Sequence, residues 1–199
     1  MRTVYFLCFT FLFCTSFLAA QSLAIPAGYI VTKDDHHLTG SIGTIEHNAS
    51  GSLVEFINDF GTPYVLHPAL IKGFVFFEGP VVNAYESKYY QNKWMYLRLI
   101  YAGDNVSLLK TPDNFIKYEW QDGQIIARES RIRQYWVELP GDRILPLQRM
   151  GFRRQMRKLC RDEAPQLATK IGSPGYRFKD LYRILAEYDQ ESAKGKRRL

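Results

Sequence analysis

The fold is decided by the stretch WMYLRLIYAGDNVSLLKT, which spans Trp94–Thr111. Apolar and polar side chains alternate there on both sides of Gly103-Asp104, a period of two that is typical of half-buried strands. A two-residue turn that begins with glycine fits type II′ geometry, in which the leading residue has a positive φ. The resulting register places Tyr101 opposite Val106, so one face of this predicted β-hairpin is apolar throughout.

Turn signals recur on both sides of this hairpin and divide the chain into further predicted strands. These segments are 28–32, 38–45, 53–57, 64–67, 71–77, 81–90, 115–121, 124–129, 135–139 and 143–147. Asp122-Gly123 is one of the strongest short hairpin signals among the connections. The spacing is typical of an all-β sandwich or barrel, and no convincing repeat of fixed period indicates a propeller or solenoid.

The hydrophobic period changes after the last predicted strand from two to about 3.6 residues. Phe152, Met156 and Cys160 then fall on one helical face. A short helix is predicted over 166–171, and a second amphipathic helix over 178–188. The fold class is therefore α+β: an antiparallel β-sandwich or open β-barrel meander followed by two or three C-terminal helices.

The N-terminus has the pattern of a secretory signal peptide over residues 1–20. Arg2 supplies a positive charge, a nearly unbroken apolar run covers Val4 to Phe13, and small residues follow up to Ala20. The apolar run is short for a transmembrane helix, which needs roughly 17–25 residues. We therefore expect cleavage near Ala20, a mature chain without a transmembrane span, and a periplasmic or cell-surface location. Cys160 is then the one remaining cysteine, so the mature chain forms no internal disulfide.

The mature chain divides into parts of opposite charge. The predicted β-rich region, 21–148, has 11 Lys/Arg and 14 Asp/Glu, a net of −3. The segment 149–199 has 14 Lys/Arg and 6 Asp/Glu, a net of +8. We expect helices over 149–191 to pack on the β-rich region as one domain, with a basic tail over 192–199. Such a charge asymmetry indicates contact with an anionic surface.

The segment Gly28–Lys33, followed after a polar turn by Leu38-Thr39-Gly40, resembles the start of a group of uncharacterised secreted proteins from Bacteroidetes-type bacteria. The segment Tyr64–Phe74 is similar to their second recurrent segment, and a C-terminal helix that closes on Tyr188 is similar to their ends. The resemblance implies an envelope or surface setting. Because it rests on turns and strand residues, it carries over no catalytic residue.

Catalytic and metal-binding patterns do not stand out. The turn Asp34-Asp35-His36-His37 contains metal-ligating side chains, but neighbours on a tight turn point in different directions, and a metal site needs several that converge. No Gly-x-Ser-x-Gly elbow, Walker loop or dinucleotide fingerprint is present. The sequence therefore predicts no catalytic residue, metal or cofactor. Carboxylate pairs distant in sequence leave a secreted hydrolase as the alternative.

Aromatic residues crowd the predicted strands, where they commonly fill the core and form cross-strand pairs. Exposed aromatic side chains on a sheet can also stack sugar rings. The candidates for such an exposed surface are Tyr89, Tyr90, Tyr96 and Arg98. They predict a partner, such as a glycan, for the β-rich region.

The first predicted helix carries four basic candidates for partner binding, which are Arg153, Arg154, Arg157 and Lys158. Their charge suits an anionic lipid or glycan, and we expect no nucleic acid because a secreted protein rarely meets one. A solvated helix that only covers the sheet is the alternative role. The leading hypothesis is a non-catalytic secreted or cell-envelope protein that binds a protein, glycan or lipid partner.

Overall fold

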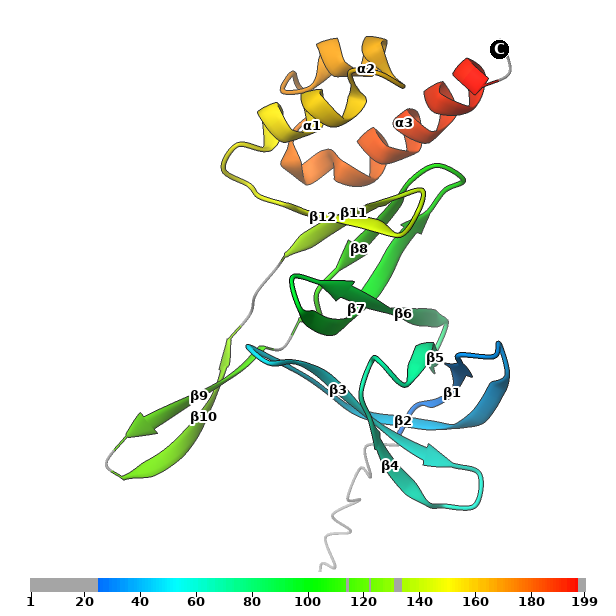
Figure 1. The fold of residues 1–199 in the computed structure, drawn as a ribbon, viewed down its shortest axis with the longest axis vertical. Coiled ribbons are helices and arrows are strands. Elements are labelled where there is room, and N and C mark those ends of the chain that lie inside the picture. The colour runs from blue at the N-terminus through cyan, green and yellow to red at the C-terminus, as the bar shows by residue number, and fades with distance from the viewer. Residues whose placement is uncertain (1–24, 114, 122, 131–133, 197–199) are drawn as a thin grey trace, which may run out of the picture.

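The computed structural model describes residues 25–113, 115–121, 123–130 and 134–196, so the predicted signal peptide, 1–20, lies outside the described residues. A mostly antiparallel sheet forms the body of the molecule, and a layer of helices covers one end of it (Figure 1). A two-stranded ribbon projects away from the body. The α+β class is confirmed, and the sheet is open because its two outermost strands do not pair with each other.

The main sheet has ten strands in the order β12-β11-β8-β7-β6-β5-β1-β2-β3-β4. They are β1 (Ala27–Thr32), β2 (His37–Asn48), β3 (Gly51–Asn58), β4 (Pro63–Leu66), β5 (Ile71–Glu78), β6 (Val81–Tyr90), β7 (Lys93–Ala102), β8 (Ser107–Lys110), β11 (Tyr135–Leu139) and β12 (Arg143–Leu147). The ribbon pairs β9 (Phe115–Gln121) with β10 (Gln124–Ser130). Each predicted strand is confirmed, with ends that shift by up to a few residues.

The helical layer contains α1 (Phe152–Cys160), α2 (Pro165–Lys170), the 3₁₀ turn η1 (Phe178–Asp180) and α3 (Leu181–Lys196). The predicted helical segments are therefore present. The segment 192–199, predicted as a basic tail, begins as the last part of α3, and Ser192 is buried. Within the described ranges, no helix combines the length and apolar character that crossing a membrane requires.

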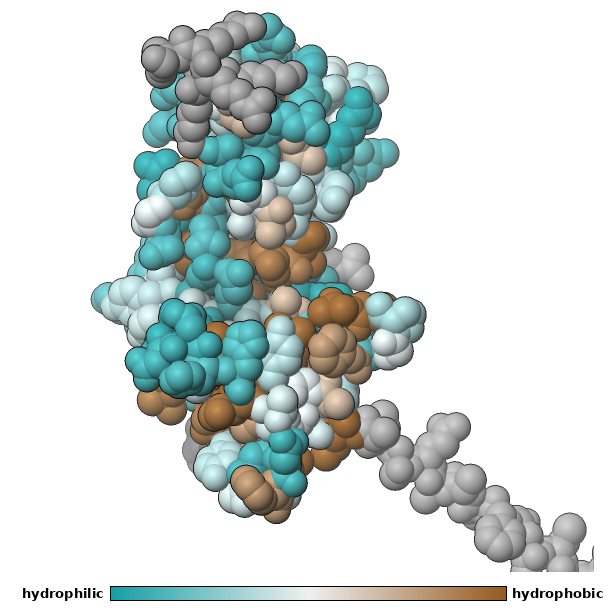
Figure 2. Space-filling view, turned by 90° about the vertical axis from the view of Figure 1, so that its right-hand side faces the viewer, coloured by the Kyte–Doolittle hydropathy of each residue, from teal (hydrophilic) through white to brown (hydrophobic). Residues whose placement is uncertain are grey.

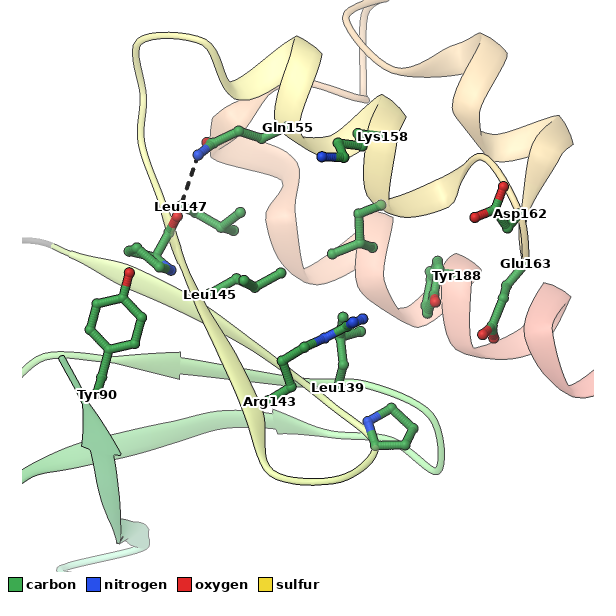
Figure 3. A pocket seen from close by; sticks show the side chains of 13 residues that line it. Tyr90, Leu139, Arg143, Leu145, Leu147, Gln155, Lys158, Asp162, Glu163 and Tyr188 are labelled. Carbon is green, nitrogen blue, oxygen red and sulfur yellow. Dashed lines mark hydrogen bonds between the residues drawn. The ribbon is translucent and has the colours of Figure 1, made fainter.

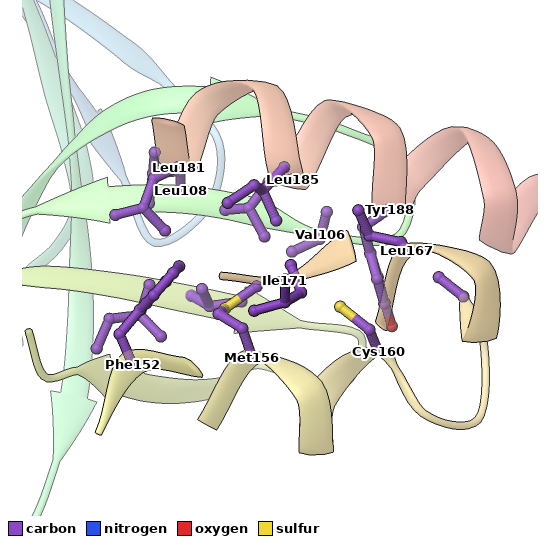
Figure 4. Packing of buried hydrophobic residues seen from close by; sticks show 14 of the residues in the cluster. Val106, Leu108, Phe152, Met156, Cys160, Leu167, Ile171, Leu181, Leu185 and Tyr188 are labelled. Atoms are coloured by element: carbon purple, nitrogen blue, oxygen red, sulfur yellow. The ribbon is translucent and has the colours of Figure 1, made fainter. Parts of the chain in front are cut away.

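Three clusters of buried side chains hold these elements together. The first, called here the cap core, packs β8, β11 and β12 against α1, α2 and α3 (Figure 4). The second lies among β1, β2, β3, β5, β6 and β7 and includes Tyr96. The third joins Met95 and Leu97 to residues of β8, β11 and β12. Because Tyr96 points to one cluster and its neighbours to another, β7 is buried on both faces.

The predicted register of the central hairpin, which places Leu99 opposite Leu108 and Tyr101 opposite Val106, is wrong. A β-bulge at Ile100 places Leu99 opposite Leu109 and Tyr101 opposite Leu108. One extra residue in a strand transfers the following side chains to the other face of the sheet. Tyr101 consequently packs against the cap core, whereas Leu99 packs against the third cluster.

The predicted two-residue turn is also wrong. The loop runs between Ala102 and Ser107, and the Gly103 N–H closes it by donating to the Val106 carbonyl at 3.0 Å. Gly103 does not have the positive φ of a type II′ turn. Its Cβ position would lie 2.6 Å from Oδ2 of Asp189 on α3, so glycine is needed there for a close approach rather than for backbone conformation.

The carboxylate of Asp189 holds this loop. The Asn105 N–H donates to Oδ1 at 2.7 Å, and the Asp104 N–H donates to Oδ2 at 3.2 Å. The Tyr101 hydroxyl also donates to Oδ2, at 3.3 Å. Burial by itself would raise the pKa of Asp189, but the hydrogen bonds from Asn105 and Asp104 outweigh it and lower the pKa below its usual value. The ionised carboxylate therefore ties α3 to the central hairpin.

We predict that Asp189→Asn lowers the free energy of unfolding at neutral pH by about 1–3 kcal/mol, because the amide carries no charge and has one acceptor oxygen fewer. The depressed folded-state pKa makes the carboxylate contribute fully above its unfolded pKa and lose that contribution as the pH falls through the folded value. Urea unfolding at a series of pH values should therefore show the two proteins converging in acid. A stability difference that persists unchanged into strong acid would contradict the prediction.

Candidate partner-binding surface

One apolar face anchors α1 to the sheet. Phe152, Met156 and Cys160 lie four residues apart and are all buried in the cap core (Figure 4). This spacing places their side chains on one stripe of a helix. The other side of α1 therefore points in a fixed direction, away from the sheet.

The outward side of α1 is basic. Its exposed residues Arg153, Arg154 and Lys158, with Arg161 at the helix end, are called here the basic face. Arg157 is only half-exposed, and its Nε is buried without a hydrogen-bond partner among the described residues. Three of the four predicted basic residues are thus exposed, and the fourth is partly covered. The side of the helical layer nearer α3, which faces the viewer in Figure 2, is also mainly hydrophilic.

Most carboxylates of the helical region have partners away from the basic face. Glu187, for example, forms an ion pair with Lys170 and accepts a hydrogen bond from the Tyr176 hydroxyl at 2.9 Å. Asp180 accepts a hydrogen bond from the Arg177 N–H at the start of its own 3₁₀ turn, and the carboxylates that accept hydrogen bonds or ion pairs from other elements are Glu187, Asp189 and Glu191. In the part of the chain that the structure describes, no ion pair links a carboxylate to the basic face. Its positive charge is therefore not neutralised internally.

A groove of about 660 Å³ lies between β12 and the helices, and is called here the cap groove (Figure 3). Tyr90 lies at one end of it, and Asp162 and Glu163 lie at the other. Arg143 and Lys158 also line it. The structure thus brings together Tyr90 and Lys158, which the sequence predicts separately, one as an aromatic and one as a basic contact.

The cap groove does not extend the positive surface or offer a free strand edge. Its two basic and two acidic side chains balance each other in number. Pro146 of β12 has no N–H, and its carbonyl accepts a hydrogen bond from Gln155 Nε2 at 3.5 Å. Gln155 Oε1 in turn accepts from the Gln148 N–H at 3.0 Å. Proline and this side chain protect the outer edge of the sheet from a further strand.

The aromatic candidates separate in the structure. Tyr89 is 53% exposed, whereas Tyr90 is half-buried with its ring edge-on to Trp136 at 5.0 Å between centroids. The prediction that Tyr96 faces outward is wrong, because Tyr96 is fully buried and its hydroxyl donates to the Leu66 carbonyl at 3.2 Å. Alternation predicts one solvated face for β7, but tertiary packing covers both faces.

Arg98 lies apart from the other candidates. It is half-buried and lines an open hollow of about 990 Å³ together with three carboxylates, Glu55, Glu78 and Asp113. Asn83, which is buried, donates from Nδ2 to Glu78 at 2.9 Å. Asp113 forms an ion pair with Lys110. This hollow therefore has carboxylates from segments that are distant in the sequence.

The His47–Ser52 pair and Cys160 are buried. His47 Nδ1 and Ser52 Oγ lie 2.7 Å apart, but both residues are covered, and burial lowers the pKa of His47. Cys160 is fully buried in the cap core, and burial raises the pKa of its thiol to about 12. A polymer or lipid substrate could not approach these groups without a change of structure. They are accordingly explained as parts of the core.

The turn Asp34–His37 forms no metal centre in the structure. Asp35 pairs with Lys72, and the His37 ring stacks on Tyr29 at 4.8 Å between centroids. Among the described residues, no group of three or more His, Cys, Asp or Glu side chains is placed to hold a metal ion.

Comparison with known proteins found no matching family model, curated protein or solved structure. Function is therefore inferred from the chemistry of the described residues. The sequence pattern does not point to Arg143, Asp162 and Glu163, which line the cap groove, or to Asp189, which bonds to a loop distant in sequence. One available signal was the shortage of acidic residues in 149–199, which makes the position of each one informative.

Proposed function

We propose that the protein is a non-catalytic envelope protein whose helical layer binds an anionic lipid surface. The observation that supports this best is that α1 is held by three buried side chains while its basic face has no internal carboxylate partner among the described residues. A rigid helix with unneutralised outward charge is suited to a flat array of negative headgroups.

The expected attraction is electrostatic. Each basic residue close to an anionic membrane contributes roughly 1 kcal/mol, so the basic face supplies about 4 kcal/mol in total. This attraction falls off within a Debye length of about 8 Å at physiological salt. The described residues of α1 include no exposed aromatic side chain that could insert into the lipid. Binding should therefore be reversible and sensitive to salt.

We predict that the triple variant Arg153→Glu, Arg154→Glu, Lys158→Glu no longer sediments with vesicles of phosphatidylglycerol and phosphatidylethanolamine, whereas the wild type does. Arg157 is left unchanged, because a glutamate there would be partly buried and could unfold the helix. Raising the salt to about 0.5 M should release the wild type from the vesicles as the mutation does, because the higher ionic strength shortens the Debye length.

A matched control reverses three exposed basic residues of the β-rich region, Lys33, Lys72 and Arg128, which changes the net charge equally. This control should keep its vesicle binding if the basic face is responsible. Equal loss in both variants would show that only net charge matters. No binding by the folded wild type would contradict the proposal.

Export is the second part of the proposal. The charged and apolar pattern of residues 1–20 supports it, as does the resemblance of Gly28–Lys33 to secreted proteins. We predict that the mature protein begins near Gln21 and is recovered in the envelope or periplasmic fraction. N-terminal sequencing of the purified product together with fractionation checks this. A cytosolic product that retains Met1 would contradict it.

A secreted hydrolase is the second candidate function, favoured by the three carboxylates of the hollow beside Arg98. Glycosidases use two carboxyl groups roughly 5–9.5 Å apart. If the hollow is catalytic, the wild type releases reducing ends from envelope polysaccharide, and Glu55→Gln or Glu78→Gln abolishes that release without unfolding the protein. Absence of release by the wild type would remove this candidate.

Of the two sheet architectures expected from the sequence, we propose the open barrel for the strands β3-β2-β1-β5-β6-β7. Lys93 Nζ of β7 donates to the Ala49 carbonyl in the β2–β3 turn at 2.7 Å, which supports an approach of β7 to β3. These strands also share the buried cluster that contains Tyr96.

A further inference from the structure

β6 extends beyond the strand that flanks it on one side. Its pairing with β5 reaches only as far as Gly73 opposite Glu86. Its pairing with β7 continues to Tyr89 opposite Trp94 and one residue further. The segment Ser87–Tyr90 therefore pairs with β7 on one edge, and β5 does not pair with it on the other. A notch of about 770 Å³ lies at this step in the sheet.

An aromatic platform forms one side of the notch. The rings of Tyr89 and Trp94 lie 5.2 Å apart between centroids at an angle of 49°, and both line the notch. The turn after β6 fixes their position: Gln91 and Asn92 both have positive φ, and Asn92 Oδ1 accepts a hydrogen bond from the Tyr89 hydroxyl at 3.1 Å. Lys33 Nζ lies over the Trp94 ring at 5.0 Å from its centroid.

Polar groups of both kinds line the notch. Lys33 supplies donors beside the platform, whereas Glu86 and Asp142 supply acceptors elsewhere in the notch, since alternation turns Glu86 to the face of β6 opposite Tyr89. The hydroxyl of Ser87, which also lines the notch, is buried and has no hydrogen-bond partner among the described residues. A buried hydroxyl without a partner is costly, so a ligand that provides one stabilises the site.

The charges around the notch are largely neutralised. Lys88 forms ion pairs with Glu86 and Glu138, and Lys72 pairs with Asp35. The notch therefore offers hydrogen bonds and a stacking surface without a strong net field. This distinguishes it from the basic face of α1, which has charge and no exposed aromatic ring.

We propose that the notch binds a neutral saccharide, with a sugar ring stacked on Trp94 and Tyr89 and its hydroxyls bonded to Ser87 and the charged rim. A pyranose has an apolar C–H face and hydroxyls that both donate and accept, which matches this combination of groups. An anionic ligand gains little from a neutralised rim. An extended peptide that pairs with Ser87–Tyr90 is the competing occupant, and the test distinguishes it from a saccharide.

The test measures binding of cellohexaose, maltohexaose and N-acetylchitohexaose by calorimetry. We expect at least one of these neutral probes to bind the wild type, and Trp94→Ala to weaken that binding by about tenfold or more, as the loss of an aromatic contact implies. Trp94→Phe should retain most of it. Ser87→Ala should weaken binding without lowering the melting temperature, because its hydroxyl has no partner in the described part of the protein.

Trp136→Phe is the control for a general effect of removing an indole, since Trp136 is 7% exposed and lies in the third cluster. It should leave saccharide binding unchanged. Failure of all three probes to bind at up to about 5 mM would overturn the proposal. So would unchanged binding in Trp94→Ala, or binding of a proline-rich peptide in place of every saccharide. Vesicle binding through α1 is measured separately, so either proposal can fail alone.

Discussion

The contact between Asp189 and the loop that precedes β8 connects the two layers of the molecule. One carboxylate receives two backbone N–H groups of the loop as well as the Tyr101 hydroxyl. These hydrogen bonds hold the loop without the turn geometry that a short hairpin would otherwise need, and they fix the position of α3 on β7 and β8. Because α3, α1 and α2 share the cap core, the direction of the basic face depends on the same contact.

The central strand explains why the predicted site residues do not form one surface. β7 is buried on both faces, so Tyr96 fills a core although alternation places it opposite Met95 and Leu97. Neighbouring residues of β6 point to opposite sides, which sends Tyr89 to the notch and Tyr90 to the cap groove. Aromatic residues that are adjacent in sequence therefore serve different surfaces.

The molecule offers two surfaces of different chemistry. The basic face of α1 has charge without exposed rings, and the notch has rings and hydrogen-bonding groups with largely paired charges. An envelope protein that holds an anionic surface with one and a neutral glycan with the other would connect two components of the same envelope. The basic face lies on a helix whose opposite side is buried in the cap core, so it requires no change of fold to bind.

The elements could be predicted from the sequence: the strands with their period of two, the change of period before α1, the basic character of its outer side and the positions of most turns. These properties depend on local spacing, which a sequence displays directly. Tertiary structure alone decided the bulge at Ile100, the burial of Tyr96 and the step between β5 and β6 that brings Lys33 to Trp94. Those features depend on which distant strand or helix covers a given face of the sheet. The alternation of residue types does not reveal this, because it is the same for a strand covered on one face and for a strand covered on both.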